Sequence, residues 1–302
     1  VIPPLNLADW QAEFARYKEI PQFAKLNPDM TLDGFKTIFW WEWSHRLLAR
    51  VLGLVFIVPA LAFWLTGRLK GRLGRRVLLA TALLALEPLV GWWMVASGLS
   101  ERTEVAQERL ALHLLIAAAV FWTLVYAAVG LGAREARPQA RRFVAPAHIL
   151  AALVFVQLGL GALVAGLRAG LIYNTWPLMD GALVPDGLTV IQPVWLNAFE
   201  NAKAVQFLHR MSAYFLLLLV FANLLWLRHR LPGTPHANRA LVLLGLVCLQ
   251  ASIGITTLVL AVPIGWALAH QGLAILLLGF AVAHWRAFAG EYPRPTEVAV
   301  RL

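Results

Sequence analysis

Apolar residues along the chain fall into seven long runs, which short polar stretches separate. Each run is close to the roughly 20 residues that an α-helix needs to cross the hydrocarbon core of a bilayer. The pattern therefore predicts an all-α membrane protein with transmembrane helices over residues 37–66, 76–97, 107–131, 145–167, 203–227, 239–260 and 264–285. Residues 1–36 form a polar, proline-bearing arm before them, in which residues 10–17 are a candidate amphipathic helix.

Composition supports the membrane class. Apolar residues make up 60% of the chain and charged residues 14%, whereas a soluble domain averages about 25% charged residues. The net charge of +10 comes from basic residues in short loops rather than on one face, so it predicts contact with membrane lipids and not with nucleic acid. Cys248 is the one cysteine of the sequence, which excludes a disulfide framework, a zinc motif and a CxxCH motif for covalent haem.

Lysine and arginine gather in alternate loops, and such loops are usually cytoplasmic. This rule places the N-terminal arm outside and the tail, residues 289–302, in the cytoplasm. The basic residues are Arg68, Lys70, Arg72, Arg75 and Arg76 after the first helix, Arg134, Arg137, Arg141 and Arg142 after the third, and Arg228, Arg230 and Arg239 after the fifth. The outer loops carry acidic residues, namely Glu101, Glu104, Glu108, Asp180, Asp186 and Glu200.

The second half of the chain repeats the first half. The first and third helices match the fifth and seventh, and the matching positions are His45 with His209, Arg46 with Arg210, and His113 with His270. The helix at 145–167 has no counterpart in the first half. Two pseudo-symmetric four-helix bundles would therefore need one more helix before Val1, with 37–131 as an incomplete first bundle and 145–288 as the second.

Four of the eight histidines lie at one depth. His45, His113, His209 and His270 each fall within about two turns, roughly 10 Å, of the outer end of an inward-running helix. In an up-and-down bundle the second and fourth helices are diagonal neighbours, and facing side chains there build cofactor sites. Two imidazoles facing each other across a bundle can ligate haem iron. The alternative is that each histidine bonds to a neighbouring helix.

Charged residues accompany these histidines. Glu42 lies one turn before His45, and ionisable groups inside a membrane span mark functional sites by default; the alternative is that it pairs with Arg46. Arg46 and Arg210 each follow a histidine and are candidates to bind haem propionates, unless they extend to lipid headgroups. Glu87, in the second helix, fits either a polar path or a buried neutral glutamate bonded across helices, and is not assigned to the site.

Several motifs resemble those of haem A synthase, in its proteobacterial and mitochondrial branch. The resemblance covers nearly the whole chain. The motifs are Glu42-Trp43-Ser44-His45-Arg46, Gly91-Trp92-Trp93-Met94-Val95 with Ser97-Gly98-Leu99, residues 164–170 with 173–181, and Gln206-Phe207-Leu208-His209-Arg210-Met211.

The resemblance implies a fold of eight helices in two bundles. It implies that haem O binds as substrate between His45 and His113, and that a non-covalent b-type haem (haem b) stays between His209 and His270. The family's reaction is two successive hydroxylations of one haem methyl, giving a diol that loses water to the formyl group of haem A, with Glu42 as the catalytic carboxylate. The family's first helix is absent before Val1. A cysteine pair that another branch of the family carries in its outer loops is also absent, so a thiol-based role does not transfer.

The sequence therefore predicts an oxidoreductase of haem A biosynthesis and cytochrome oxidase assembly in a bacterial cytoplasmic (inner) membrane. Its haem sites would lie toward the periplasm, and haem O synthase is a candidate to deliver the substrate. One alternative is a bis-histidine di-haem cytochrome b that only carries electrons, which needs two equivalent resident haems and no carboxylate beside one of them. A transporter fits less well, because transporter sites lie near the midplane.

Overall fold

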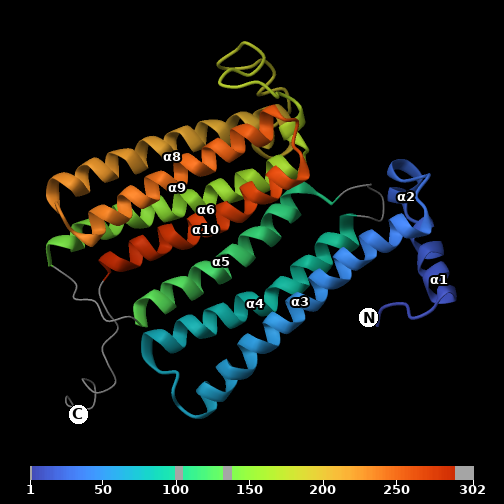
Figure 1. Ribbon diagram of the computed structural model, residues 1–302, viewed down its shortest axis with the longest axis horizontal. Coiled ribbons are helices and arrows are strands. Elements are labelled where there is room, and N and C mark those ends of the chain that lie inside the picture. Colours follow the sequence, from blue (N-terminus) through green and yellow to red (C-terminus); the bar gives the residue numbers. More distant parts are fainter. Residues whose placement is uncertain (1, 99–104, 132–137, 290–302) are drawn as a thin grey trace.

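The computed structural model of the chain describes residues 2–98, 105–131 and 138–289. Within these residues, seven helices are long and apolar enough to cross a membrane, and Figure 1 shows them side by side. They are α3 (Leu32–Leu65), α4 (Gly71–Gly98), α5 (Gln107–Leu131), α6 (Val144–Gly166), α8 (Ala202–Arg230), α9 (Pro235–Val259) and α10 (Ile264–Phe288). The predicted all-α polytopic membrane fold is confirmed.

Several helices begin earlier than the apolar runs suggest, because polar caps fix their first turns. The Thr31 hydroxyl accepts the N–H of Gly34 (3.3 Å) before α3, and Asp33 lies in the first turn of that helix, where a negative charge is favourable. Pro235 occupies the first turn of α9, a position where the missing N–H has no helical partner to lose. Hydropathy alone does not detect these first turns, because their residues are polar.

Four helices of the second half pack as a closed ring. The order of packing is α6 on α8, α8 on α9, α9 on α10, and α10 back on α6. As a result α8 and α10 lie on one diagonal, and α6 and α9 lie on the other. This is the packing order of a four-helix bundle.

The first half is attached to this ring through α5. That helix packs against α6 and α10 on one side and against α4 on the other, and α4 in turn packs against α3 (Figure 1). Gly279 of α10 permits one close approach, since a Cβ there would lie 3.0 Å from the ring of Phe121 in α5. The helix predicted before Val1 remains a prediction.

The main apolar core lies where α5, α6, α8, α9 and α10 meet. Among its buried members are Ala118, Leu150, Val154, Val220, Leu243 and Leu278. By contrast, α3 packs mainly against α4 and the N-terminal arm, and most of its apolar side chains are exposed. Exposed apolar faces of this kind suit a helix that contacts lipid.

The N-terminal arm contains two helices, α1 (Leu7–Lys18) and α2 (Pro21–Leu26). The first contains the predicted amphipathic segment, whereas the second was not predicted. Aromatic rings hold the arm against α3: Trp10 lies 4.9 Å from Phe39, and Phe14 lies 5.3 Å from Phe35, measured between ring centroids. Because α3 begins at Leu32, the last residues of the predicted arm belong to that helix.

The segment between α6 and α8 lies beyond the ends of the ring helices (Figure 1). It contains two 3-10 turns, η2 (Ala169–Leu171) and η3 (Val194–Leu196), and the short helix α7 (Asn197–Glu200). Asn201 caps α8 through the N–H groups of Lys203 and Ala204, and its amide also donates to the carbonyl of Gly187 (2.7 Å). The cap of α8 therefore anchors this segment as well.

Some of the predicted topology signals fall outside the described residues. These are Glu101, Glu104, Arg134, Arg137 and the cytoplasmic tail beyond residue 289. The direction in which the chain crosses the membrane stays a prediction.

Candidate functional site

The four candidate histidines all lie on helices that begin at the same end of the molecule. In Figure 1, α3, α5, α8 and α10 each start at the end where α1, α2 and the segment before α8 lie. His113, His209 and His270 fall within about two turns of the start of their helices. Because α3 begins earlier than predicted, His45 lies farther along its helix.

His209 lies against two residues of α6, Gln157 and Gly161. The amide Nε2 of Gln157 donates to the backbone carbonyl of His209 (2.9 Å) and lies 3.1 Å from its ring Nδ1. The Gln157 carbonyl accepts the hydroxyl of Ser212, which fixes the orientation of the amide. One turn along α6, a Cβ on Gly161 would lie 3.3 Å from Cε1 of the His209 ring.

His270 has the same surroundings, supplied by α9. Gln250 Nε2 donates to the backbone carbonyl of His270 (2.9 Å) and lies 3.1 Å from Nδ1. A Cβ on Gly254 would lie only 2.6 Å from Cε1 of the ring. Only glycine fits at this position without movement of the ring.

His113 has a carboxylate where the other two histidines have an amide. The Oε2 atom of Glu87 in α4 lies 2.6 Å from Nδ1 of His113, and a Cβ on Gly91 would lie 3.0 Å from Cε1. Glu87 of α4 therefore contacts the neighbouring helix α5 through His113.

The two predicted histidine pairs are arranged differently. His209 and His270 lie on α8 and α10, the helices on one diagonal of the ring. His45 is exposed on α3, and α4 packs between α3 and α5. Coordination of one iron by His45 and His113 stays a prediction.

Glu42 forms an ion pair with Arg46. This pairing is the alternative to a functional role that the sequence analysis named for Glu42. The carboxylate Oε1 lies 2.5 Å from a guanidinium nitrogen of Arg46, and the two side chains are 54% and 51% exposed. An exposed pair on one helix contributes at most about 1 kcal/mol. The pair is therefore too weak to keep either side chain from binding a ligand.

Arg210 is buried, at 7% exposure, and holds the segment before α8. Its two terminal nitrogens donate to the carbonyls of Thr175 (2.9 Å) and Tyr173 (2.8 Å), and Gln206 donates to the same Tyr173 carbonyl (3.1 Å). The buried Nε has no hydrogen-bond partner among the described residues. The Nε–H of a fixed guanidinium thus remains for an anion such as a carboxylate.

The residues around the histidines were not predicted, although the sequence carries a signal for them. In an apolar helix, a polar residue four positions before a glycine places both on one face. The pattern occurs at residues 87 and 91, 157 and 161, and 250 and 254. Each occurrence lies in the helix that precedes a histidine helix.

These surroundings suit a haem, because the porphyrin supplies four ligands to the iron and two protein side chains can supply the other two. The described residues contain no group of three or more histidine, cysteine or acidic side chains that would hold a bare metal ion. Each glycine lets its helix approach the edge of an imidazole, and Arg210 keeps a free donor nearby. Pairs of histidines with such support are an appropriate donor set for haem.

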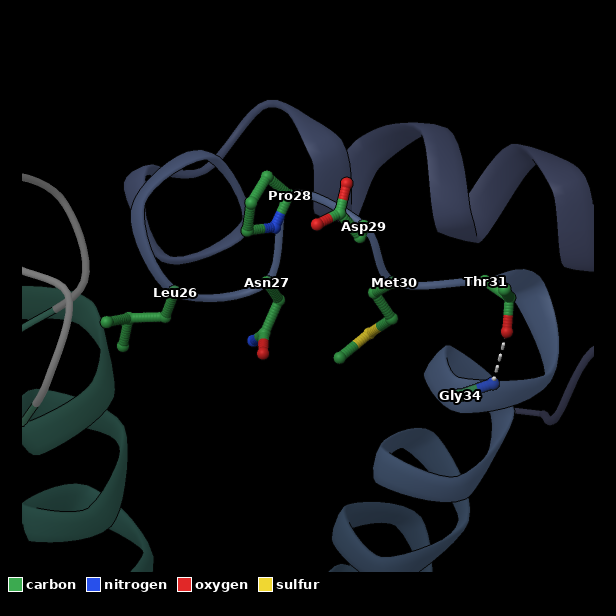
Figure 2. A pocket seen from close by; sticks show the side chains of 7 residues that line it. All are labelled: Leu26, Asn27, Pro28, Asp29, Met30, Thr31 and Gly34. Carbon is green, nitrogen blue, oxygen red and sulfur yellow. Dashed lines mark hydrogen bonds between the residues drawn. The ribbon is translucent and has the colours of Figure 1, made fainter.

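A hollow in the arm lies apart from these residues. Figure 2 shows it between α2 and the start of α3, with a volume of about 420 Å³. Its lining consists of Leu26, Asn27, Pro28, Asp29, Met30, Thr31 and Gly34. Gly34 precedes His45 by roughly 16 Å along α3 at 1.5 Å per residue, so the hollow is not part of the histidine site.

Comparison with known proteins decides the family. The family model described as COX15-CtaA, cytochrome oxidase assembly protein, matches residues 1–282. The chain belongs to this family. Among curated relatives in it, the heme A synthase of Sinorhizobium fredii is 54% identical over 303 residues, covering 100% of this chain and 82% of the relative. The heme A synthases of Agrobacterium fabrum and Sinorhizobium medicae are 53% and 52% identical, and the chain covers 82% of each.

Membership of the cytochrome oxidase assembly family confirms the resemblance found in the sequence motifs. The match extends through α3, α4, α5 and the ring of α6, α8, α9 and α10, so it includes all four histidine positions.

Proposed function

We propose that the protein is a haem A synthase that oxidises one methyl group of haem O to the formyl group of haem A. The observation that carries the proposal is the similarity, over the full length of this chain, to relatives named heme A synthase. Each hydroxylation replaces a C–H bond of the methyl carbon by a C–O bond. The oxygen atom comes from water or dioxygen, and the two electrons removed from that carbon pass to an oxidant from outside this chain. The second hydroxylation gives a geminal diol, which loses water to leave the formyl group.

His45 and His113 are the proposed axial ligands of the substrate, haem O. Glu42 precedes His45 by one helical turn, on the same face of α3. Oxidation of the methyl carbon releases protons, and a positioned carboxylate that accepts one typically accelerates such a step by about 10²–10⁴-fold. The histidines cannot serve as this base while they ligate iron. Arg46, which already contacts Glu42, is proposed to bind a haem propionate.

His209 and His270 are the proposed ligands of a resident haem b, which when bound supplies one-electron redox chemistry. Their position on diagonal helices supports the assignment, as do the glycines that face both rings. The free Nε of Arg210 makes this residue the candidate to hold a propionate of that haem.

The proposed setting is a bacterial cytoplasmic membrane, with the histidines toward the periplasm and haem O synthase as the deliverer of haem O. The arginine-rich ends of alternate helices support this direction. To test it, Cys248 is replaced by serine and Asp180 by cysteine, and intact cells are treated with a maleimide that cannot cross the membrane. Labelling from outside is expected, and labelling only after cell lysis would reverse the topology.

The competing function is a cytochrome b that carries electrons between two resident haems. Identification of the haems that copurify with the full chain separates the two functions. A synthase is expected to contain haem b together with haem O or haem A. Haem b alone, at two per chain, would overturn the proposal in favour of the carrier.

A further inference from the structure

The three supported histidines share one structural unit, built from two helices. A polar side chain of the preceding helix meets the histidine at Nδ1, and a glycine four residues later meets the ring at Cε1. The units are Glu87, Gly91 and His113; Gln157, Gly161 and His209; and Gln250, Gly254 and His270. Because the backbone arrangement is common to all three, the polar side chain is what distinguishes them.

The amide and the carboxylate bond to different atoms. Gln157 and Gln250 each donate their amide N–H to the backbone carbonyl of the histidine (2.9 Å in both cases), so they join one helix to the next. An ionised carboxylate only accepts hydrogen bonds. Glu87 instead contacts the ring, where Oε2 lies 2.6 Å from Nδ1 of His113.

A carboxylate this close to a ring nitrogen favours a hydrogen on that nitrogen. With the hydrogen on Nδ1 of His113, the lone pair of Nε2 is left for a metal ion. Hydrogen bonds from metal-ligating histidines to carboxylates orient the ring and raise its basicity as a ligand. The side chains of Glu87 and His113 are only 13% and 25% exposed, so water screens the negative charge weakly.

We propose that Glu87 is a positioning residue that acts through His113, and that it gives the haem in the first half of the protein a lower reduction potential than an amide would. The inference rests on the proposed function, because it takes His113 as a ligand of haem O. A negative charge close to the iron favours the more positive, oxidised form. The haem of the second half has amides in the equivalent positions, so electrons removed at the first haem would pass favourably to the second.

The test is an anaerobic redox titration of the full-length protein, purified with its resident haem and loaded with haem O. Glu87→Gln should fold and bind haem O, since glutamine occupies the same place beside His209 and His270. The haem bound through His113 should become at least tenfold easier to reduce, a rise of about 59 mV for one electron. The potential of the resident haem should stay unchanged.

The matched control is the reverse exchange, Gln250→Glu, which should lower the potential of the resident haem and leave the other haem unchanged. An unchanged potential for haem O bound to Glu87→Gln would overturn the inference and leave the proposed function intact. If Glu87→Gln no longer binds haem O, the Gln250→Glu variant becomes the test. An unchanged reduction potential of its resident haem then overturns the inference. If haem O uptake does not depend on His113 at all, as a His113→Ala variant would show, the assignment of the substrate site fails as well.

Discussion

The close approach of α9 to His270 gives a sharp test of the second haem site. Gly254→Ala would place a Cβ 2.6 Å from Cε1 of the ring, 0.8 Å inside the 3.4 Å at which ordinary contact begins. The imidazole or the helix must therefore move by most of an ångström. Gly245 lies in the same helix with nothing within 4 Å of its Cβ position, so Gly245→Ala is the matched control.

The two substitutions should have opposite effects on stability. Alanine in place of glycine in a helix gains up to about 1 kcal/mol, and the control receives this gain without any new contact. Overpacking typically costs about 1–3 kcal/mol, so Gly254→Ala should be neutral to about 2 kcal/mol less stable. If the same 1–3 kcal/mol instead weakens the interaction between His270 and the haem, the resident haem should bind about 5- to 150-fold more weakly.

The assay is the reduced-minus-oxidised spectrum of each purified variant, together with its haem content per chain and its thermal unfolding in detergent. Gly254→Ala should lose or shift the b-type spectrum, and Gly245→Ala should keep it with an equal or higher Tm. A full haem content and an unchanged spectrum in Gly254→Ala would refute the placement of His270 against α9 as a haem ligand.

Two further predictions concern the ligands and the buried arginine. Replacing His209 or His270 by alanine should remove the low-spin b-type spectrum, whereas replacing His45 or His113 should leave most of it; equal losses from all four would contradict separate sites. Arg210→Lys should cost about 1–3 kcal/mol, because one ammonium cannot reproduce the forked bonds to Tyr173 and Thr175, and the Thr175 carbonyl would lose its donor. This loss is measured as a lower Tm and faster proteolysis of the segment before α8. The exposed Arg46→Lys, its control, should change the Tm little.

Hydropathy predicted the membrane helices well because it reports a property that each segment has by itself. The centres of α5, α6 and α10 follow directly from their apolar runs. The start of α3 does not, because Thr31 and Asp33 stabilise a polar first turn that lies outside the apolar run. The short helix α2 was missed for a related reason: its six residues carry no periodic signal.

The candidate site shows where sequence reasoning loses information. Depth along a helix can be counted in residues, so the similar depth of His113, His209 and His270 was visible in the sequence. The depth of His45 was not, because α3 begins earlier than its apolar run. The partner of each histidine depends on the rotation of the neighbouring helix, which no single segment determines; Glu87 therefore had two interpretations until α4 was packed against α5. Arg46 and Arg210 occupy matching positions in the repeat, yet one is exposed and the other holds the carbonyl groups of a folded segment.

The central claim is tested most directly by measuring haem A formation from haem O in a host that lacks this activity of its own. Extracted haems are separated and quantified for the unchanged chain and for Glu42→Gln, which keeps the side-chain shape and removes the charge. The account predicts haem A from the unchanged chain, and from the variant little haem A with bound haem b and haem O retained. Haem A output from the variant near that of the unchanged chain would contradict the catalytic role of Glu42, and no haem A from a folded, haem-loaded unchanged chain would contradict the proposed function.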